Sequence, residues 1–525
     1  MIKHLKLDTD FAFKFIMTSY GILLFSLIGN GACSLADESR YWHTADYIWY
    51  LSNGNIKTAF FQLFSEGGRP GLVIAQIPSV ICQSVLYKIC GVDPRSIDSL
   101  IIPQVFNWAT ILYIVWCIYY LCQNAFGFDK YKSTITCIFY ILLVSTSLYV
   151  RHLLPYSYGL AAFLTCWVLV YKQVSSFKIG MLSAFAFTIY PGNAWFIILI
   201  LIALIYHKQK AFGSIDWLFF IKVFFKFGLG ICATIFGFEL LSQWTENSYI
   251  VGIIEASHTF VNDFKIPYDG SVIFILDYIN SVEGIFGCFL LVGFIFYFFG
   301  VVIRLFSKRQ IDLLGILTIA IIFGHLFQAS IGYYLGYKVY YLRLIYPYLP
   351  FIVLTTIDFI FSSSTVPYAT FKCMILIVFG LWNMYHFYRD YRSLGYPRDI
   401  YNELGILNEK TGKEYDICIN SPSNQRLNQV FEYNPFNIYT TPPQGLFVHY
   451  QSVIKPDSNY IFLNFSSLPY NDKDTLTPLN SQLRPEWILK KPHYKTFMPY
   501  WFDEDPKQKR NFLGDYKLMI GVYKK

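Results

Sequence analysis

Long apolar runs recur along the first three quarters of the chain, separated by short polar segments. A run of about 20 apolar residues is long enough to cross a hydrocarbon core of roughly 30 Å as a helix. The pattern predicts about eleven such helices, at 12–33, 100–122, 134–151, 157–171, 179–190, 194–207, 218–243, 284–306, 312–333, 343–361 and 371–388. Only Tyr190–Asn193 separates the fifth run from the sixth, so these could be two helices or one broken helix.

One apolar segment, 70–92, departs from this pattern. Prolines and polar residues interrupt it, at Pro70, Gln76, Pro78, Gln83 and Lys88. We therefore predict that it forms helices lying in the membrane interface, within an outer loop that covers 34–99.

The composition of the chain changes at Arg389, where charged and turn residues return. The stretch 398–412 has helical periodicity and ends at a glycine. Three later stretches are rich in β-branched and aromatic residues and predict strands: Tyr415–Asn420, Tyr460–Asn464 and Tyr516–Val522. The fold class predicted is mainly α. A membrane domain of about 11 (11–13) helices covers 1–388, and a small α/β domain outside the membrane covers 389–525.

The composition supports a polytopic membrane protein. Of the 525 residues, 55% are hydrophobic and 14% are charged, whereas a soluble globular chain has about 25% charged residues. This excludes a soluble enzyme, a disordered chain and a disulfide-rich secreted scaffold. The first run, from about Phe15 to Ala32, has no small-x-small cleavage site and is predicted to be an uncleaved helix. Most of the 11 cysteines lie in apolar runs, with neither a CxxC pair nor zinc spacing.

Lysine and arginine in the short loops predict the orientation of the chain. One set of loops carries thirteen of them and the alternate set three, Arg151, Lys338 and Arg343. Cytoplasmic loops are enriched in these residues. The N-terminus is therefore predicted to be cytoplasmic, with 34–99, 244–283 and the tail on the outer side of a cell inner membrane or its equivalent. The net charge of +8 is explained in this way and does not indicate nucleic acid as a partner.

Candidate chemistry begins directly after the first predicted helix, in Ala36–His43. Asp37 and Glu38 are adjacent carboxylates at the membrane surface, where a carboxylate can deprotonate an acceptor while a lipid-linked group departs. The alternative is that Asp37 caps an amphipathic helix over Ser39–Ser52. Arg69, ahead of the predicted interfacial segment, could hold a lipid phosphate or could be an ordinary interfacial arginine.

The order of these elements resembles a known family. A first helix is followed by Asp-Glu-x-Arg-Tyr, a glycine-bearing loop, a basic residue before proline, an apolar segment with a Gly-Val turn, and an Ile-Pro that opens the next span. This series, over about residues 10–125, resembles the C-type polytopic glycosyltransferases, above all the protein O-mannosyltransferases and the lipid A aminoarabinose transferase. The stretch Tyr341–Pro350 is similar to the start of a late helix in that family.

The resemblance implies inverting transfer of a sugar from a polyprenyl-phosphate donor to a glycan, lipid or protein acceptor at the outer face. It implies Asp37 as the catalytic base and Glu38 as its neighbour. Donor-phosphate contacts are expected from Arg69, Arg343, Lys338 and Arg151, and acceptor or substrate contacts from Arg40, Tyr41, His152 and His258. No cofactor is implied with certainty. A divalent metal is possible, but the loop 150–157 lacks the second carboxylate that some relatives carry.

Two other classes of function remain open. An O-antigen polymerase or ligase would need outer loops with clusters of arginine and histidine, in which 244–283 is poor. A lipid-linked glycan transporter or flippase predicts inverted internal symmetry and charges at mid-membrane. His325, in the ninth span, is the one ionisable side chain that fits this second class.

Overall fold

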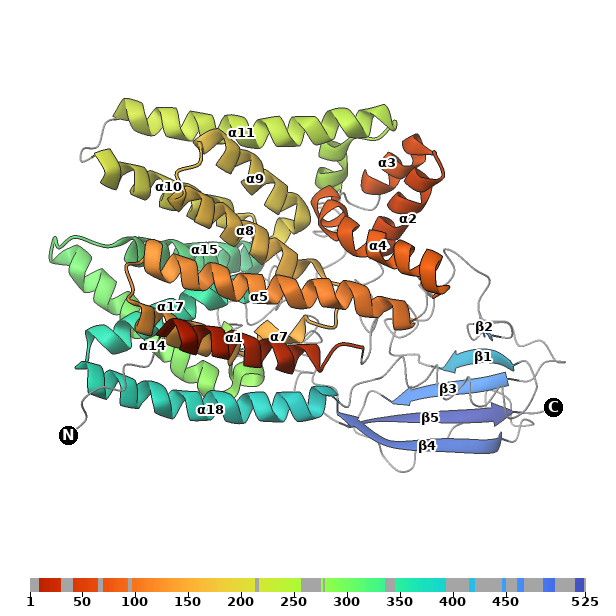
Figure 1. Cartoon of the computed structure of the whole chain (residues 1–525). Helices are drawn as coiled ribbons and strands as arrows, with labels where there is room; N and C mark the ends of the chain where they lie inside the picture. Colours follow the sequence, from red (N-terminus) through yellow and green to blue (C-terminus); the bar gives the residue numbers. More distant parts are fainter. Residues whose placement is uncertain are drawn as a thin grey trace.

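The computed structural model describes residues 9–29, 41–64, 69–92, 97–212, 217–255, 275–276, 279–335, 345–392, 415–420, 446–449, 460–466, 485–495 and 515–523. Most of these residues are helical, and the long helices lie lengthwise in one bundle (Figure 1). The helices are α1 (Thr9–Phe25), α2 (Tyr41–Ser52), α3 (Ile56–Phe64), α4 (Pro70–Cys90), η2 (Ile97–Leu100), α5 (Ile101–Asn124), α6 (Lys130–Ile141), α7 (Val144–Leu148), α8 (Pro155–Tyr171), α9 (Ser176–Ile189), η3 (Pro191–Asn193), α10 (Trp195–Phe212), α11 (Trp217–Trp244), η4 (Ile279–Glu283), α14 (Gly284–Phe306), α15 (Leu313–Leu335), η5 (Tyr346–Tyr348), α17 (Leu349–Ser362) and α18 (Val366–Arg392).

The lengths of the described helices support a multi-pass membrane protein. Five contain an apolar stretch long enough to cross a membrane: Pro70–Cys90, Ile101–Asn124, Trp217–Trp244, Gly284–Phe306 and Val366–Tyr388. Five further apolar helices are shorter, at Pro155–Tyr171, Ser176–Ile189, Trp195–Gln209, Leu313–Phe327 and Tyr346–Ser362. The number of eleven spans therefore stays a prediction.

Two predicted segments differ from the structure. The segment 70–92 forms a single helix, α4, with Pro78 inside it, where more than one helix was predicted. Its location in the membrane interface stays a prediction. Gln76 and Gln83, two of the polar residues that suggested interruptions, are buried and hydrogen-bonded to Thr44 and Ser99, whereas Lys88 is exposed. The predicted span 134–151 is divided into α6 and the short α7, because the backbone N–H groups of Val144 and Ser145 bond to Glu283 on a distant segment.

Helices α9 and α11 touch through glycines. A Cβ atom on Gly180 would lie 2.1 Å from the carbonyl oxygen of Phe227, and one on Gly230 would lie 2.1 Å from the carbonyl oxygen of Phe177. Small residues let two helix backbones approach closely where lipid supplies no hydrophobic drive to associate. These reciprocal contacts fix α9, whose C-terminal end borders the site described below.

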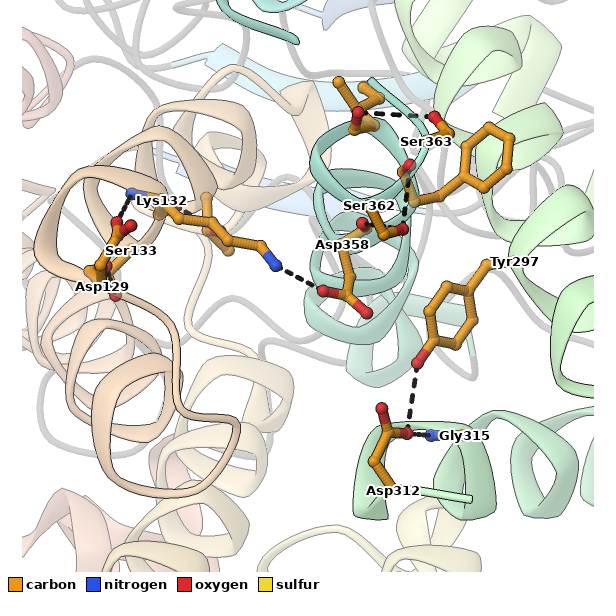
Figure 2. Close-up of polar contacts among 12 residues, drawn as sticks. Asp129, Lys132, Ser133, Tyr297, Asp312, Gly315, Asp358, Ser362 and Ser363 are labelled. Atoms are coloured by element: carbon orange, nitrogen blue, oxygen red, sulfur yellow. Dashed lines mark hydrogen bonds and ion pairs between the residues drawn. The ribbon is translucent and has the colours of Figure 1, made fainter. Parts of the chain in front are cut away.

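Basic residues of the loops predicted to be cytoplasmic lie together at one end of the bundle. Lys130 at the start of α6 pairs with Asp10 at the start of α1, 2.5 Å apart. The neighbouring Lys132 pairs with Asp358 near the end of α17 (Figure 2). Lys172, after α8, lies over the ring of Tyr120 near the end of α5. These contacts bring the ends of α1, α5, α6, α8 and α17 together, and the side of a membrane that they face stays a prediction.

A third ion pair joins α14 to α15 at their connection. Asp312 accepts hydrogen bonds from the Gly315 amide at 2.8 Å and the Tyr297 hydroxyl at 3.4 Å (Figure 2). Its carboxylate also lies 3.7 Å from Arg304. An aspartate in this place satisfies an amide at the start of α15 that has no partner within the helix.

Five strands follow α18 in the chain: β1 (Tyr415–Asn420), β2 (Leu446–His449), β3 (Tyr460–Ser466), β4 (Pro485–Lys495) and β5 (Asp515–Tyr523). They form one mixed sheet with the order β2-β1-β3-β5-β4 (Figure 1). β1 is parallel to both of its neighbours, and β5 is antiparallel to both of its own. Three of the strands overlap those predicted. The helix predicted at 398–412 lies outside the described residues, so the α/β assignment of this domain stays a prediction.

Candidate functional site

Four of the ten predicted site residues fall within the described ranges. The side chains of Arg69, Arg151 and His152 are described, and Tyr41 is placed as the first residue of α2. The other six, Asp37, Glu38, Arg40, His258, Lys338 and Arg343, lie outside the described residues.

The loop 149–154, between α7 and α8, carries Arg151 and His152 into the interior of the bundle. Each of these two side chains is only 2% exposed. Two amides on α5 hold the loop by its backbone. Gln104 Nε2 donates to the carbonyl of Arg151 at 3.1 Å, and Asn107 Nδ2 donates to the carbonyl of His152 at 2.7 Å. Buried carbonyl groups without regular secondary structure need such donors, so Gln104 and Asn107 determine where the loop lies.

Gln104 also connects this loop to the end of α1. Its Oε1 accepts a hydrogen bond from the Gly29 amide at 2.7 Å. Gly29 is the last described residue before the segment 30–40, which contains Asp37 and Glu38. One amide side chain thus joins the start of that segment to the loop that carries Arg151 and His152.

The first described turns after that segment also pack on the loop. Leu153 forms a small apolar cluster with Ala45 of α2, Val80 of α4 and Leu100 of η2. Ala45 lies about one helical turn from Tyr41, where α2 begins. The described chain after 30–40 therefore packs with the same loop to which Gln104 links the chain before that segment.

A series of tyrosines connects Arg69 to the loop. The Arg69 guanidinium lies 5.6 Å from the ring centre of Tyr190, within the range of a cation–π contact. The rings then follow edge to face: Tyr190 to Tyr156 at 5.0 Å, Tyr156 to Tyr149 at 5.0 Å, and Tyr149 to Tyr346 at 5.1 Å. Edge-to-face rings favour one another electrostatically and pack rigidly. The Arg69 end of α4 and the Arg151 loop are thus parts of one packed cluster.

The last tyrosine of this series extends the cluster toward a third predicted basic segment. Tyr346 is fully buried, and its hydroxyl lies 3.5 Å from Ser157 Oγ on α8. The chain between 336 and 344, which holds Lys338 and Arg343, ends just before Ile345 and Tyr346. The first described residues after 336–344 therefore belong to the tyrosine cluster.

An apolar cavity of about 220 Å³ lies between α14, α15 and α17. Its lining is almost wholly aliphatic and aromatic and includes one histidine, His325 of α15. Tyr348 lines it as well, two residues after Tyr346 in the same short helix. The cavity thus borders the tyrosine cluster, and its chemistry suits a hydrocarbon chain.

The residues that hold the site together were not among those predicted. Gln104, Asn107, Tyr149, Tyr156 and Tyr190 carry no charge, and the prediction rested on charged groups. A usable signal existed in the sequence, since Gln104 and Asn107 are amides three positions apart in an apolar run and so share one helix face. Polar side chains inside a membrane helix need internal partners.

No group of three or more histidine, cysteine, aspartate or glutamate side chains that could hold a metal ion occurs within the ranges that the structure describes. Asp37 and Glu38 lie outside those ranges, so metal dependence stays an open expectation.

Comparisons with protein-family models, with curated proteins and with solved structures find no match to this chain. The residues of the site are therefore the basis for assigning its function.

Proposed function

We propose that this protein is a membrane glycosyltransferase. It moves a sugar from a polyprenyl-phosphate donor to an acceptor at the end of the bundle opposite the basic loops, with inversion at the sugar carbon. Asp37 deprotonates the acceptor, and Arg69 and Arg151 balance the charge of the departing polyprenyl phosphate. By the positive-inside rule, this end faces away from the cytoplasm.

One observation carries the proposal. The described chain before 30–40, the segment with the candidate base, is linked to the loop that carries Arg151 and His152 through Gln104, which bonds both Gly29 and Arg151. The chain after that segment shares an apolar cluster with the same loop, through Ala45 and Leu153. A base and a fixed cation on opposite sides of a sugar are the two groups that this reaction needs. The base acts on the acceptor, and the cation lowers the barrier by stabilising charge that develops on the leaving phosphate oxygen.

The surroundings of this loop favour a lipid-linked donor. The apolar cavity between α14, α15 and α17 lies beside Tyr346 and Tyr348 and can take part of a hydrocarbon chain. A phosphate attached to such a chain would lie at the boundary between this cavity and the cationic cluster. The donor carries no nucleotide, so the reaction needs no glycine-rich phosphate loop.

Binding of the carrier tests the first part of the proposal. The purified protein is titrated in nanodiscs with polyprenyl phosphate, and its melting temperature is followed. A ligand that binds only the folded state raises stability by RT ln(1 + [L]/Kd). We expect saturable stabilisation by polyprenyl phosphate, with less from a polyprenol of equal length. Equal responses to both lipids would refute a phosphate site.

Transfer from polyprenyl-phosphate sugars to membrane acceptors tests the second part. Asp37→Asn should abolish transfer while the protein is still produced and still binds polyprenyl phosphate. The matched control is Asp129→Asn at the basic end of the bundle. Asp129 caps α6 by accepting from the Lys132 amide at 2.7 Å, and asparagine caps equally well. Normal turnover by Asp37→Asn would refute the assignment of the base.

A further inference from the structure

Glu283 is a fully buried carboxylate that no step of the proposed reaction uses. It is the last residue of η4, directly before α14, and it is 0% exposed. It accepts hydrogen bonds from the amides of Val144 at 2.7 Å and Ser145 at 3.0 Å, and from the Ser145 hydroxyl. A buried carboxylate is costly unless donors satisfy it, and these three hydrogen bonds lower that cost.

The backbone around Glu283 is shaped to place this carboxylate. The π-helical turn ends at Gly284, whose φ of +57° is a conformation that favours glycine. A Cβ atom on Gly287 would lie 2.2 Å from the Glu283 Cβ, so glycine at 287 leaves the room that this side chain fills. Asn383 of α18 donates to the Glu283 carbonyl at 3.1 Å and holds the turn from outside. Three local features thus converge on one side chain.

The element that Glu283 holds leads directly into the site. α7 continues into Tyr149 and the loop with Arg151 and His152. Tyr20 of α1 holds the same short helix, with its hydroxyl 3.3 Å from Thr146 Oγ1 and 3.1 Å from Ser147 Oγ. The loop is therefore fixed at its start by Glu283 and Tyr20, and farther along by the two amides of α5.

We propose that Glu283 is a positioning residue, which sets the place of Arg151 and His152 by clamping the first turn of α7. The positioning follows from the hydrogen bonds above. Its consequence for catalysis rests on the proposed function. Glutamine at 283 would keep the volume of the side chain. Its NH₂ group, however, would replace one carboxylate oxygen that now accepts from Val144 or Ser145, and would face those donors without accepting from them. At least one bond to the turn would be lost, and the loop would open more often.

A matched control exists at another buried glutamate. Glu239 of α11 is 7% exposed and accepts from the Ile250 amide at 2.8 Å and from the Ser248 hydroxyl at 2.9 Å. Like Glu283 it accepts from a backbone amide and a serine hydroxyl, but it clamps the turn after α11 and also accepts from Gln243. Glu239→Gln therefore reports the general cost of replacing a buried, bonded carboxylate.

The experiment measures how fast diethyl pyrocarbonate modifies His152 in the full-length protein in nanodiscs, with the site located by mass spectrometry. His386 on α18 is more exposed and is the internal reference. For Glu283→Gln we expect modification of His152 to be faster by about tenfold, since a lost charged hydrogen bond shifts a local equilibrium by that order. For Glu239→Gln we expect no change.

A rate for Glu283→Gln equal to that for Glu239→Gln would overturn the proposal. If Glu283→Gln does not fold, Ser145→Ala takes its place, because it removes only the hydroxyl donor and leaves both amides. Ser145→Ala should raise the modification rate of His152 by a smaller factor and leave that of His386 unchanged. An unchanged rate at His152 would also overturn the proposal.

Transfer kinetics separate this proposal from the proposed function. If the wild-type protein transfers sugar, Glu283→Gln should lower kcat/KM by about tenfold, and Glu239→Gln should leave it unchanged. If the wild-type protein transfers none, the proposed function fails, and the reactivity of His152 still decides whether Glu283 positions the loop.

Discussion

Replacing Gly71 with alanine should displace the start of α4 and weaken the site. Gly71 packs on the C-terminal end of α9. A Cβ atom there would lie 2.3 Å from Thr188 Oγ1 and 2.9 Å from both the Ile189 nitrogen and the Phe185 carbonyl oxygen. The hydroxyl can rotate, but the two backbone atoms can move only with α9. Ordinary contact begins at 3.4 Å, so α4 must shift by about half an ångström.

This displacement acts on a cation–π contact near its limit. Arg69, two residues before Gly71, lies 5.6 Å from the ring centre of Tyr190, and such contacts extend to about 6 Å. A shift of half an ångström away from α9 would bring the pair to that limit. Binding of polyprenyl phosphate should weaken in consequence, because Arg69 would no longer be held beside the cluster.

The stability cost follows from comparison with Gly228→Ala. Gly228 lies in α11, and a Cβ atom there would meet nothing within 4 Å. Alanine gains up to about 1 kcal/mol of helix propensity in the interior of a helix, as at Gly228, and no more than that at Gly71 in the first turn of α4. Overpacking costs about 1–3 kcal/mol. Gly71→Ala should therefore be less stable than Gly228→Ala by about 1–3 kcal/mol, measured by titration with SDS from mixed micelles.

A double variant tests the reasoning behind this prediction. Thr188→Ala removes the nearest of the three contacts and leaves the two backbone contacts in place. It should restore part of the stability of Gly71→Ala but not all of it. Equal stability of Gly71→Ala and Gly228→Ala, with unchanged binding of polyprenyl phosphate, would refute the close packing of α4 on α9.

Two ion pairs give the remaining predictions. The side chains of Lys132 and Asp358 are 14% and 21% exposed. Asp358→Asn should lower the free energy of unfolding by about 1–3 kcal/mol, between the values for exposed and buried pairs, and an SDS titration unchanged from wild type would contradict this. The Lys57–Glu246 pair is exposed, and its hydrogen bond lowers the pKa of Glu246. Lys57→Met should leave the melting temperature nearly unchanged at neutral pH. Any difference in melting temperature from wild type should disappear as the pH falls through the lowered pKa of Glu246. A large drop in melting temperature that does not depend on salt would contradict this prediction.

Breaks that depend on local residues were predictable from the sequence. The turn at 190–193 has a proline where the next helix begins and a glycine beside it. The structure ends α9 at Ile189 and begins α10 at Trp195. Proline fits the first turn of a helix and disfavours the helical conformation in the residue before it. The sequence therefore contained the whole cause of this break.

The division of the predicted span 134–151 depends on a distant residue. Nothing between Ile141 and Val144 prevents a continuous helix by its own propensity. The break forms because Glu283 binds the amides at the start of α7, and these partners are 139 and 138 positions apart in the chain. Periodicity reports which face of a helix is apolar, but it contains no information on such a partner.

The same limit explains why 70–92 was predicted to be more than one helix, although it forms the single helix α4. Gln76 and Gln83 suggested a helix that faces the polar surface, because amides in an apolar run are costly without partners. In the structure Gln76 accepts from Thr44 of α2 at 2.8 Å, and Gln83 donates to Ser99 Oγ at 3.0 Å. Both amides are buried, so they are attachment points for the elements on either side of the site.

The uncharged groups also bear on how the charged ones can act. Arg151 is buried, and a buried guanidinium is useful in a reaction only if it does not have to reorient when charge develops on the substrate. Its backbone carbonyl is bonded to Gln104, and its loop is clamped at Glu283. Charge in the sequence could indicate that Arg151 contacts a phosphate. The fixed position of the Arg151 loop depends on the amide of Gln104 and the carboxylate of Glu283. These two groups lie far apart in the sequence, and only the tertiary structure brings them to this loop.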